Sequence, residues 1–530
     1  MERHFTQSIS TPTPASSSVG PAKTRQQHRR LAGEGALLFL ACLALNLAVA
    51  FVLPSRPNRI LPEAMERTVR AWLVLSGDLS LLSIPSSTQP LLPTLLELPF
   101  AALPYLSRNG ISGIVMAAVY SALTCAVLDR ALAGWLIARR WRYPLVACFA
   151  LNPTVLLLTS GGSSESVSML LVLTSIHFLA WWHRTGNLQA LISLGFSLGL
   201  ASLALHQPLL YAGSILVLVW LLEGDPNRAP SGPRWAPLVT CAMPVVFVLG
   251  GWVLCSLLLP YGPQEMLRVG YLAAVQAAGS LAYLASPGDW ATDTAAAAGA
   301  ATRTLTALSP LFVAATLLLA DFRLSRRRLS LALMAIAFLL PLAQLPLPED
   351  GAAPWPERLL PTVPLVIVLV GHLLSGDAPG SGRSRVAAVA IRLVAAVALA
   401  LSIALPGFAT VQHVDHLAWG GDWEEERSIS RYLLDNADGG RVLVDLAEGY
   451  PIVFFTGQPE MFDRIQAGGP PRTEAREATA KYLLIRDPRL EGLSKALSQY
   501  PTTVTDSPSE STIHLLKEWP SSGWRLFALR

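Results

Sequence analysis

Long apolar runs separated by short arginine clusters constrain this 530-residue chain more than any other feature. A helix needs about 20 apolar residues to cross the hydrocarbon core of a bilayer, within a range of about 17–25. Runs near this length lie at residues 36–53, 111–137, 144–159, 165–182, 188–205, 208–222, 236–259, 304–320, 329–346, 358–375 and 386–408. The sequence therefore predicts an α-helical polytopic membrane protein with about 11 transmembrane helices, and it excludes a soluble enzyme.

Charged residues are scarce, at 14% of the chain against about 25% in soluble globular proteins. Surface that faces lipid excludes charge, because each ionised group there costs several kcal/mol. The arginines cluster between the apolar runs, which is typical of membrane topology rather than of nucleic-acid binding. We therefore expect a membrane partner and no nucleic acid.

The arginine clusters also predict the orientation. With the N-terminus in the cytoplasm, the loops on the inside hold Arg139, Arg140, Arg142, Arg184, Arg228, Arg234, Arg323, Arg326, Arg327, Arg328, Arg383 and Arg385. The short loops on the outside, at 160–164, 206–207 and 347–357, hold no Lys or Arg. By the positive-inside rule this pattern predicts a multi-pass protein of the plasma (inner) membrane, with a cytoplasmic N-terminus and an extracytoplasmic C-terminus.

Composition divides the chain into three parts. Residues 1–35, rich in Ser, Thr, Pro and Gln and basic, are predicted to be a disordered cytoplasmic tail. Residues 36–408 form the membrane domain, with an external loop, 54–110, that contains interfacial helices. Residues 409–530 are predicted to form a small extracytoplasmic α/β domain. Its expected strands are Arg441–Asp445, Val453–Thr456, Lys481–Arg486 and Trp524–Leu529, and its expected helices are Glu424–Asn436 and Leu490–Gln499.

Signatures of metal or nucleotide chemistry are missing from the sequence. The five cysteines all fall in apolar stretches without CxxC spacing, which favours small buried residues over metal ligands or disulfides. No zinc spacing, Gly-rich phosphate loop or Ser/His/Asp signature is present either.

Candidate functional side chains gather in the external loops: Glu63, Glu66, Asp78, Glu165, His206, Glu349, Asp350, Glu357 and Arg358. If the helices bundle, these loops converge on one external cavity. Ordinary structural interpretations stay open, because loop carboxylates are often simply solvated and Asp78 can cap a short helix. Glu165 can favour the dipole at a helix N-terminus, although a carboxylate at the end of a span is costly without a partner or a task.

Several short motifs resemble one known family in their order along the chain. They are Pro62-Glu63-Ala64-Met65-Glu66-Arg67 (similar to Asp-Ala-x-x-Arg after the first span), Gln89-Pro90-Leu91-Leu92-Pro93, Asn152-Pro153 followed by Ser164-Glu165, and Pro356-Glu357-Arg358-Leu359-Leu360-Pro361. This arrangement resembles the GT-C membrane glycosyltransferases. Within them it is most similar to the bacterial branch related to protein O-mannosyltransferases and lipid-A aminoarabinose transferases.

The resemblance implies transfer of a sugar from a polyprenyl-phosphate donor to an acceptor at the outer face of the membrane. Glu63 would be the catalytic base or hold a divalent metal, and Glu165 would orient the acceptor or its loop. Arg67 and Arg358 would lie beside the donor phosphate, and Glu66 and His206 complete the expected substrate-binding set. The acceptor, whether protein, lipid or glycan, is not indicated.

Two alternatives stay open. The family position usually held by Asp is Glu63 here, and a carboxylate placed one methylene further out can impair catalysis. An inactive GT-C relative that binds a lipid or a protein partner is therefore the second hypothesis. A transporter is the third, although the sequence shows no internal repeat of the kind many transporters have.

Overall fold

A computed structural model of the chain provides the structure. It describes residues 21–52, 60–77, 91–108, 110–134, 137–204, 208–223, 233, 235–257, 362–375, 423–437, 439–464, 480–486 and 513–529. The predicted spans at 304–320, 329–346 and 386–408, the helix expected at Leu490–Gln499, and the candidates Asp78, His206, Glu349, Asp350, Glu357 and Arg358 all lie outside these residues.

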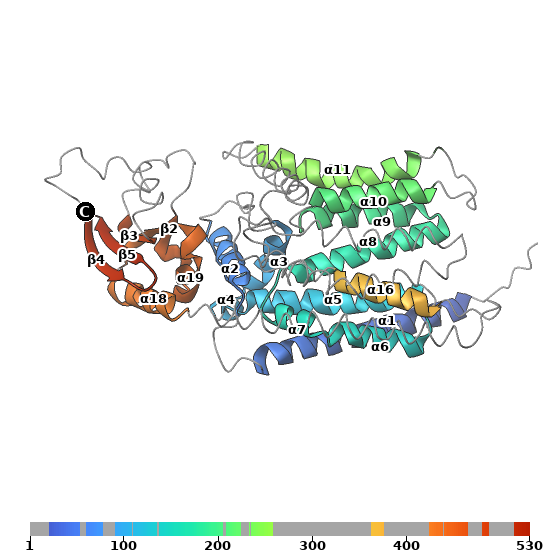
Figure 1. The fold of residues 1–530 in the computed structure, drawn as a ribbon, viewed down its shortest axis with the longest axis horizontal. Coiled ribbons are helices and arrows are strands. Elements are labelled where there is room, and N and C mark those ends of the chain that lie inside the picture. The colour runs from blue at the N-terminus through green and yellow to red at the C-terminus, as the bar shows by residue number, and fades with distance from the viewer. Residues whose placement is uncertain are drawn as a thin grey trace, which may run out of the picture.

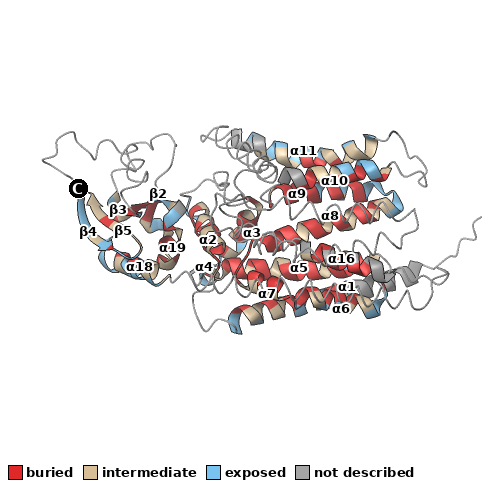
Figure 2. Cartoon of the chain, viewed as in Figure 1, coloured by how far each residue is buried: buried red, intermediate tan, exposed pale blue. Residues whose placement is uncertain are grey.

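A bundle of long helices forms the larger part of the described structure (Figure 1). Its helices are α1 (Pro21–Val52), α5 (Ser112–Gly134), α6 (Arg139–Ala150), α7 (Pro153–Ser160), α8 (Glu165–Thr185), α9 (Leu188–Ser202), α10 (Pro208–Glu223), α11 (Trp235–Leu257) and α16 (Thr362–Ser375). Helix α1 packs on α5, α5 on α8, α8 on α9 and α9 on α11. Buried residues concentrate where these helices face one another (Figure 2).

The apolar runs that fall on described residues do form helices, at bounds close to the predicted ones. Among the described residues, four helices are long and apolar enough to cross a membrane by themselves: Gly33–Val52 within α1, α5, α8 and Trp235–Trp252 within α11. Helices α6 and α7 qualify together as a span bent by 47°. Asn152 and Pro153 explain this break, because Pro153 cannot continue the first helix and the Asn152 side chain caps the second, accepting from the backbone N–H of Thr154 at 2.9 Å.

Helix α1 begins at Pro21, upstream of the predicted span and within the segment predicted to be a disordered tail, 1–35. The segment PAKTRQQHRRLAGE places a proline in the first turn and then mostly Ala, Arg, Gln and Leu. These residues favour a helix, so an apolar span can extend into a polar helical end. Residues 21–35 are thus helical in the structure, where the composition favoured a disordered tail.

Three short helices lie between the bundle and the C-terminal part of the chain (Figure 1). They are α2 (Pro62–Leu75), α3 (Leu91–Ala101) and α4 (Pro104–Arg108), all within the predicted external loop. Helix α2 starts with a proline in its first turn and is amphipathic. Met65, Val69 and Trp72 recur at helical spacing and join an apolar core shared with the C-terminal residues.

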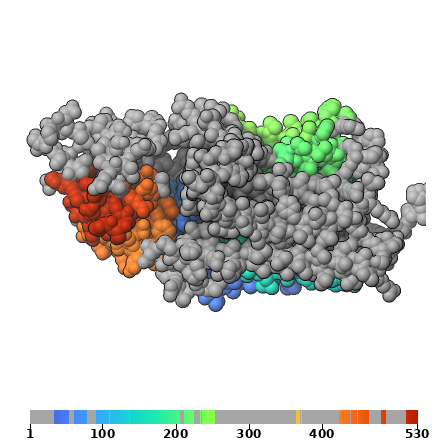
Figure 3. Space-filling view, viewed as in Figure 1, coloured from blue at the N-terminus to red at the C-terminus, as the bar shows by residue number. Residues whose placement is uncertain are grey.

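Described residues 423–529 build a compact unit around a mixed five-stranded sheet, which we call the C-terminal unit. Its elements are α18 (Glu424–Asn436), β1 (Arg441–Val444), α19 (Leu446–Thr456), η3 (Pro459–Met461), β2 (Phe462–Arg464), β3 (Ala480–Arg486), β4 (Ile513–Trp519) and β5 (Trp524–Leu529). The strand order is β2-β1-β3-β5-β4, with β1 parallel to β2 and β3 and with β5 antiparallel to β3 and β4. This unit forms one end of the molecule, coloured orange to red in the space-filling view (Figure 3).

The C-terminal unit agrees with the sequence in part. Helix α18 and strands β1, β3 and β5 lie where they were predicted. The strand predicted at Val453–Thr456 is wrong, because these residues end helix α19. Ile452, Val453 and Phe454 are consecutive apolar residues whose burial in one core favours the helix over their preference for a strand.

Candidate functional site

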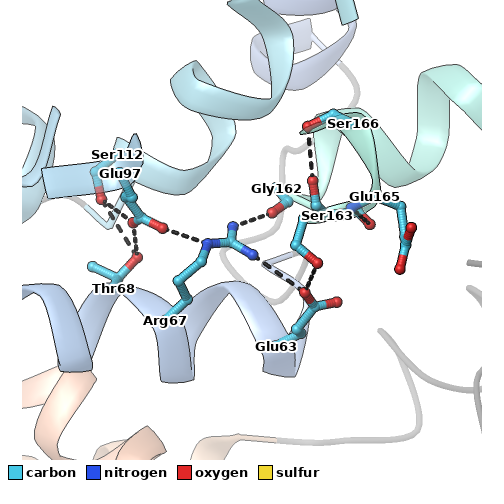
Figure 4. A network of polar contacts seen from close by, with 10 residues as sticks. Glu63, Arg67, Thr68, Glu97, Ser112, Gly162, Ser163, Glu165 and Ser166 are labelled. Carbon is cyan, nitrogen blue, oxygen red and sulfur yellow. Dashed lines mark hydrogen bonds and ion pairs between the residues drawn. The ribbon is translucent and has the colours of Figure 1, made fainter. Parts of the chain in front are cut away.

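A buried polar network joins helices α2, α3 and α5 to the turn between α7 and α8 (Figure 4). At its centre is Arg67 of α2, whose side chain has no exposed surface. Arg67 donates from Nε to Glu97 Oε2 at 2.6 Å, from Nη1 to Glu63 Oε1 at 3.3 Å, and from Nη2 to the carbonyl oxygen of Gly162. One guanidinium group therefore holds three separate segments together.

Helical spacing places Glu63 beside Arg67. The two residues are four apart in α2, and Glu63 lies in the first turn, where the helix dipole favours a carboxylate. Glu63 Oε1 also accepts a hydrogen bond from the hydroxyl of Ser164. Its side chain is 18% exposed, whereas those of Arg67 and Glu97 are fully buried. Glu63 is thus the one acidic member of this described network that a ligand can reach.

The turn that carries Ser164 depends on Gly162. This residue has φ +88°, a left-handed conformation that favours glycine, and a Cβ there would lie 3.0 Å from Ala64 Cβ. The turn is tied to the start of α2 by a hydrogen bond of 3.1 Å from Leu61 N–H to the carbonyl of Gly161. The absence of a side chain at Gly162 and this backbone hydrogen bond therefore both allow α2 to lie close to the turn.

Glu165 begins helix α8, as predicted, and its side chain is buried with only 2% of the residue exposed. Its backbone N–H donates to Ser163 Oγ at 3.2 Å. Figure 4 shows the Glu165 side chain beyond Ser163, on the side away from Glu97. Its place at the helix N-terminus is favourable for a negative charge.

The structure therefore brings Glu63, Arg67 and the Ser163–Glu165 turn together. Glu66 lies on the same helix but pairs with Arg70 at 2.5 Å, four residues on, with 14% of its side chain exposed. His206 and Arg358 lie outside the described residues. Within the described ranges, no three His, Cys, Asp or Glu side chains come together as ligands for a metal ion.

Glu97, Thr68 and Ser112 belong to this network but were not among the residues predicted for the site. Glu97 Oε1 accepts from Thr68 Oγ1 at 2.6 Å and from Ser112 Oγ at 2.8 Å. A signal for Glu97 was present in the sequence, since it is the one acid in the apolar stretch 89–105. A carboxylate in such surroundings is expensive to bury without a partner.

The helical bundle, with several apolar helices long enough to cross a bilayer, defines a multi-pass helical membrane protein. A solved structure of ArnT from Cupriavidus metallidurans bound to undecaprenyl phosphate shares this fold, with a TM-score of 0.54. The match covers 93% of this chain and 97% of that chain at 13% sequence identity, a level at which the likeness concerns the fold. No family model and no curated protein sequence matches this chain.

Proposed function

We propose that this protein transfers a sugar from a polyprenyl-phosphate donor to an acceptor at the outer face of the membrane. The fold supports the proposal, since the similar ArnT structure holds undecaprenyl phosphate. A donor of this kind keeps its lipid tail in the bilayer and presents its phosphate and sugar at the membrane surface. The end of a bundle such as this one is where that headgroup would meet an acceptor.

The exposure of Glu63 within an otherwise buried network is the observation that carries the proposal. Arg67 and Ser164 both donate to Oε1, so among the described contacts Oε2 is left for an acceptor hydroxyl. In our proposal Glu63 takes the hydroxyl proton while the acceptor oxygen bonds to the anomeric carbon. The bond from that carbon to the phosphate oxygen breaks, and polyprenyl phosphate leaves.

The other candidates take roles that fit their burial. Arg67 is enclosed and bound to three partners, so we propose that it orients Glu63 instead of binding the donor phosphate. Arg358 and His206 remain our proposals for the phosphate side and the substrate side. Glu165 would hold the turn that carries Ser164, and Glu66 would border the acceptor path.

Helix direction supports an outer-face site. Helix α5 runs from Ser112 in the network to Gly134 at the other end, and α8 runs from Glu165 to Thr185. The basic residues Arg139 and Arg184 thus lie at the end of the bundle remote from Glu63. On the positive-inside rule we propose that this end faces the cytoplasm and that the Glu63 end, with the C-terminal unit, faces the outside.

Transfer of radiolabelled sugar in membranes that contain the protein tests the proposal. Wild type should move label from undecaprenyl-phosphate sugars, and Glu63→Ala should lose at least about 100-fold in rate, as expected on removal of a general base. Glu424→Gln is the matched control, since it changes an exposed carboxylate of α18 and should leave the rate unchanged. Folded wild type that binds undecaprenyl phosphate but transfers no sugar from any donor would favour a binding relative without catalysis.

A further inference from the structure

Glu97 lies where no substrate can reach it, and yet it makes the shorter of the two carboxylate contacts to Arg67. Glu97 has no exposed surface, and both of its carboxylate oxygens accept hydrogen bonds. Oε2 accepts from Arg67, and Oε1 accepts from Thr68 and Ser112. Three donors from two helices fix this carboxylate in one orientation. Since the guanidinium fork is planar and rigid, the bond at Nε also sets the directions of Nη1 and Nη2.

The two carboxylates bound to Arg67 are not equivalent. The Nε contact to Glu97 is 2.6 Å, whereas the Nη1 contact to Glu63 is 3.3 Å. Glu97 thus holds the main ion pair, and Glu63 has the longer, weaker one. An arginine with one carboxylate partner would pair with it tightly and would make it a poor base.

The small residue Gly113 leaves room for both Arg67 and Glu97. A Cβ on Gly113 would lie 3.1 Å from Arg67 Nη2 and 3.4 Å from Glu97 Oε1, so a larger residue there would press on both groups. Arg67 donates to Glu63 Oε1 as well as to Glu97, and the Ser164 hydroxyl donates to the same Glu63 oxygen. Arg67 is therefore the cation that the described contacts place on Glu63.

We infer that Glu97 is a positioning residue of the proposed reaction: it takes up the charge of Arg67, so that Arg67 can orient Glu63 without neutralising it. This inference rests on the proposed function. Glu97 touches neither substrate nor reacting atoms and acts through Arg67.

Glu97→Gln tests the charge with little change in shape. The amide oxygen can still accept from Arg67, and the amide nitrogen can donate to the hydroxyls of Thr68 and Ser112. Arg67 should then pair more closely with Glu63 and favour its ionised carboxylate. We expect kcat for sugar transfer to fall roughly tenfold with KM unchanged, because an interaction outside the substrate site is altered.

A readout independent of transfer separates this inference from the proposed function. Modification of Glu63 by a water-soluble carbodiimide requires the protonated carboxyl, so its rate against pH, followed by mass spectrometry of the full chain, reports the midpoint. The midpoint should move to lower pH in Glu97→Gln. It should stay in place in Thr68→Val, which removes a hydrogen bond to Glu97 without changing any charge.

Equal midpoints in wild type and Glu97→Gln would overturn the inference, whether or not the protein transfers sugar. If Glu97→Gln does not fold, Glu97→Asp replaces it: the charge stays but moves back by one methylene, so the shift should have the same direction and be smaller. An unchanged midpoint in Glu97→Asp would then overturn the inference. Wild type that transfers no sugar would instead count against the proposed function.

Discussion

Phe454 of the C-terminal unit stacks on Trp72 of helix α2, with ring centroids 5.7 Å apart and planes 10° from parallel. Both residues are 7% exposed and belong to one apolar core. Helix α2 therefore has Glu63 and Arg67 on one face and the C-terminal unit against another. The position of the candidate site depends on a part of the chain that lies almost 400 residues away, roughly the separation of Trp72 and Phe454 in the sequence.

Phe454→Ala should loosen this contact. Loss of a buried phenylalanine costs about 3–5 kcal/mol, because its transfer free energy is lost and a cavity remains. We expect a lower unfolding midpoint in detergent and faster proteolytic release of the C-terminal unit. Tyr105→Ala is the control, since Tyr105 is 75% exposed and its loss should change neither measurement. If the Phe454→Ala protein is as resistant to protease as wild type, the stacking of Phe454 on Trp72 does not stabilise the attachment of the C-terminal unit.

Gly110→Ala should disturb the same contact from the other side. Gly110 has φ +66°, and a Cβ there would lie 2.2 Å from Cζ of Phe454. Gly77 has a similar φ of +78° but has no atom within 4 Å of such a Cβ. Gly77→Ala therefore measures the cost of the left-handed conformation alone, about 1–2 kcal/mol. Gly110→Ala should lower the free energy of unfolding by more than Gly77→Ala does, because its Cβ also meets Phe454. Equal losses in the two variants would mean that Phe454 moves aside freely.

The membrane spans could be predicted because their signal is local. A run of about 20 apolar residues has few stable alternatives in a bilayer, so α5, α8 and α11 lie close to the predicted bounds. Shorter segments were harder to predict. Residues 453–456 have a preference for a strand, but they form the end of helix α19, which packs on α2. Tertiary contacts of this kind are not encoded in any short window of sequence.

The candidate site was visible in part for the same reason. Glu63 and Arg67 are four residues apart on one helix, so their pairing follows from helical geometry. The pairing of Arg67 with Glu97, 30 residues on, depends on how α2 crosses α3. A lone acid in an apolar stretch could have indicated that Glu97 has a partner, but not which partner.

Asp129→Asn should destabilise the opposite end of the bundle. Asp129 of α5 lies 2.6 Å from Arg142 of α6, and their side chains are 3% and 8% exposed. Removing one partner of a buried pair leaves a charge uncompensated, which costs about 3–5 kcal/mol. Arg142 would keep a longer ion pair with Glu34, at 3.4 Å, and its position over the Tyr143 ring. Unfolding in detergent would check the loss.

The matched control for Asp129→Asn is Glu518→Gln, which removes an ion pair with Arg525 on the sheet. That pair is closer to solvent, with side chains 40% and 30% exposed. Exposed pairs contribute about 0–1 kcal/mol. If the two variants lose the same stability, burial of the Asp129 pair has no energetic consequence and our interpretation of it is wrong.

Alkaline pH should weaken the C-terminal unit through Tyr450. Burial, and then the nearby carboxylates of Glu66 and Glu426, raise the pKa of the Tyr450 phenol well above its ordinary value. The folded chain therefore prefers the neutral phenol. An unfolded tyrosine ionises near pH 10, so the stabilisation is complete below about pH 10 and falls by about 1.4 kcal/mol per pH unit above it.

Tyr450→Phe removes the titrating group and keeps the ring, so it should lack this pH dependence. The unfolding free energies of wild type and Tyr450→Phe, measured on the full chain, should differ by a constant between pH 7 and 9. Above pH 10 wild type should lose stability more steeply, so that the two curves converge or cross. Curves that stay parallel up to pH 11.5 would mean that the phenol ionises as easily in the folded protein as in the unfolded chain. Tyr450 would then lie in contact with water, and the interface between α19 and α2 near Glu66 would have to be open to solvent.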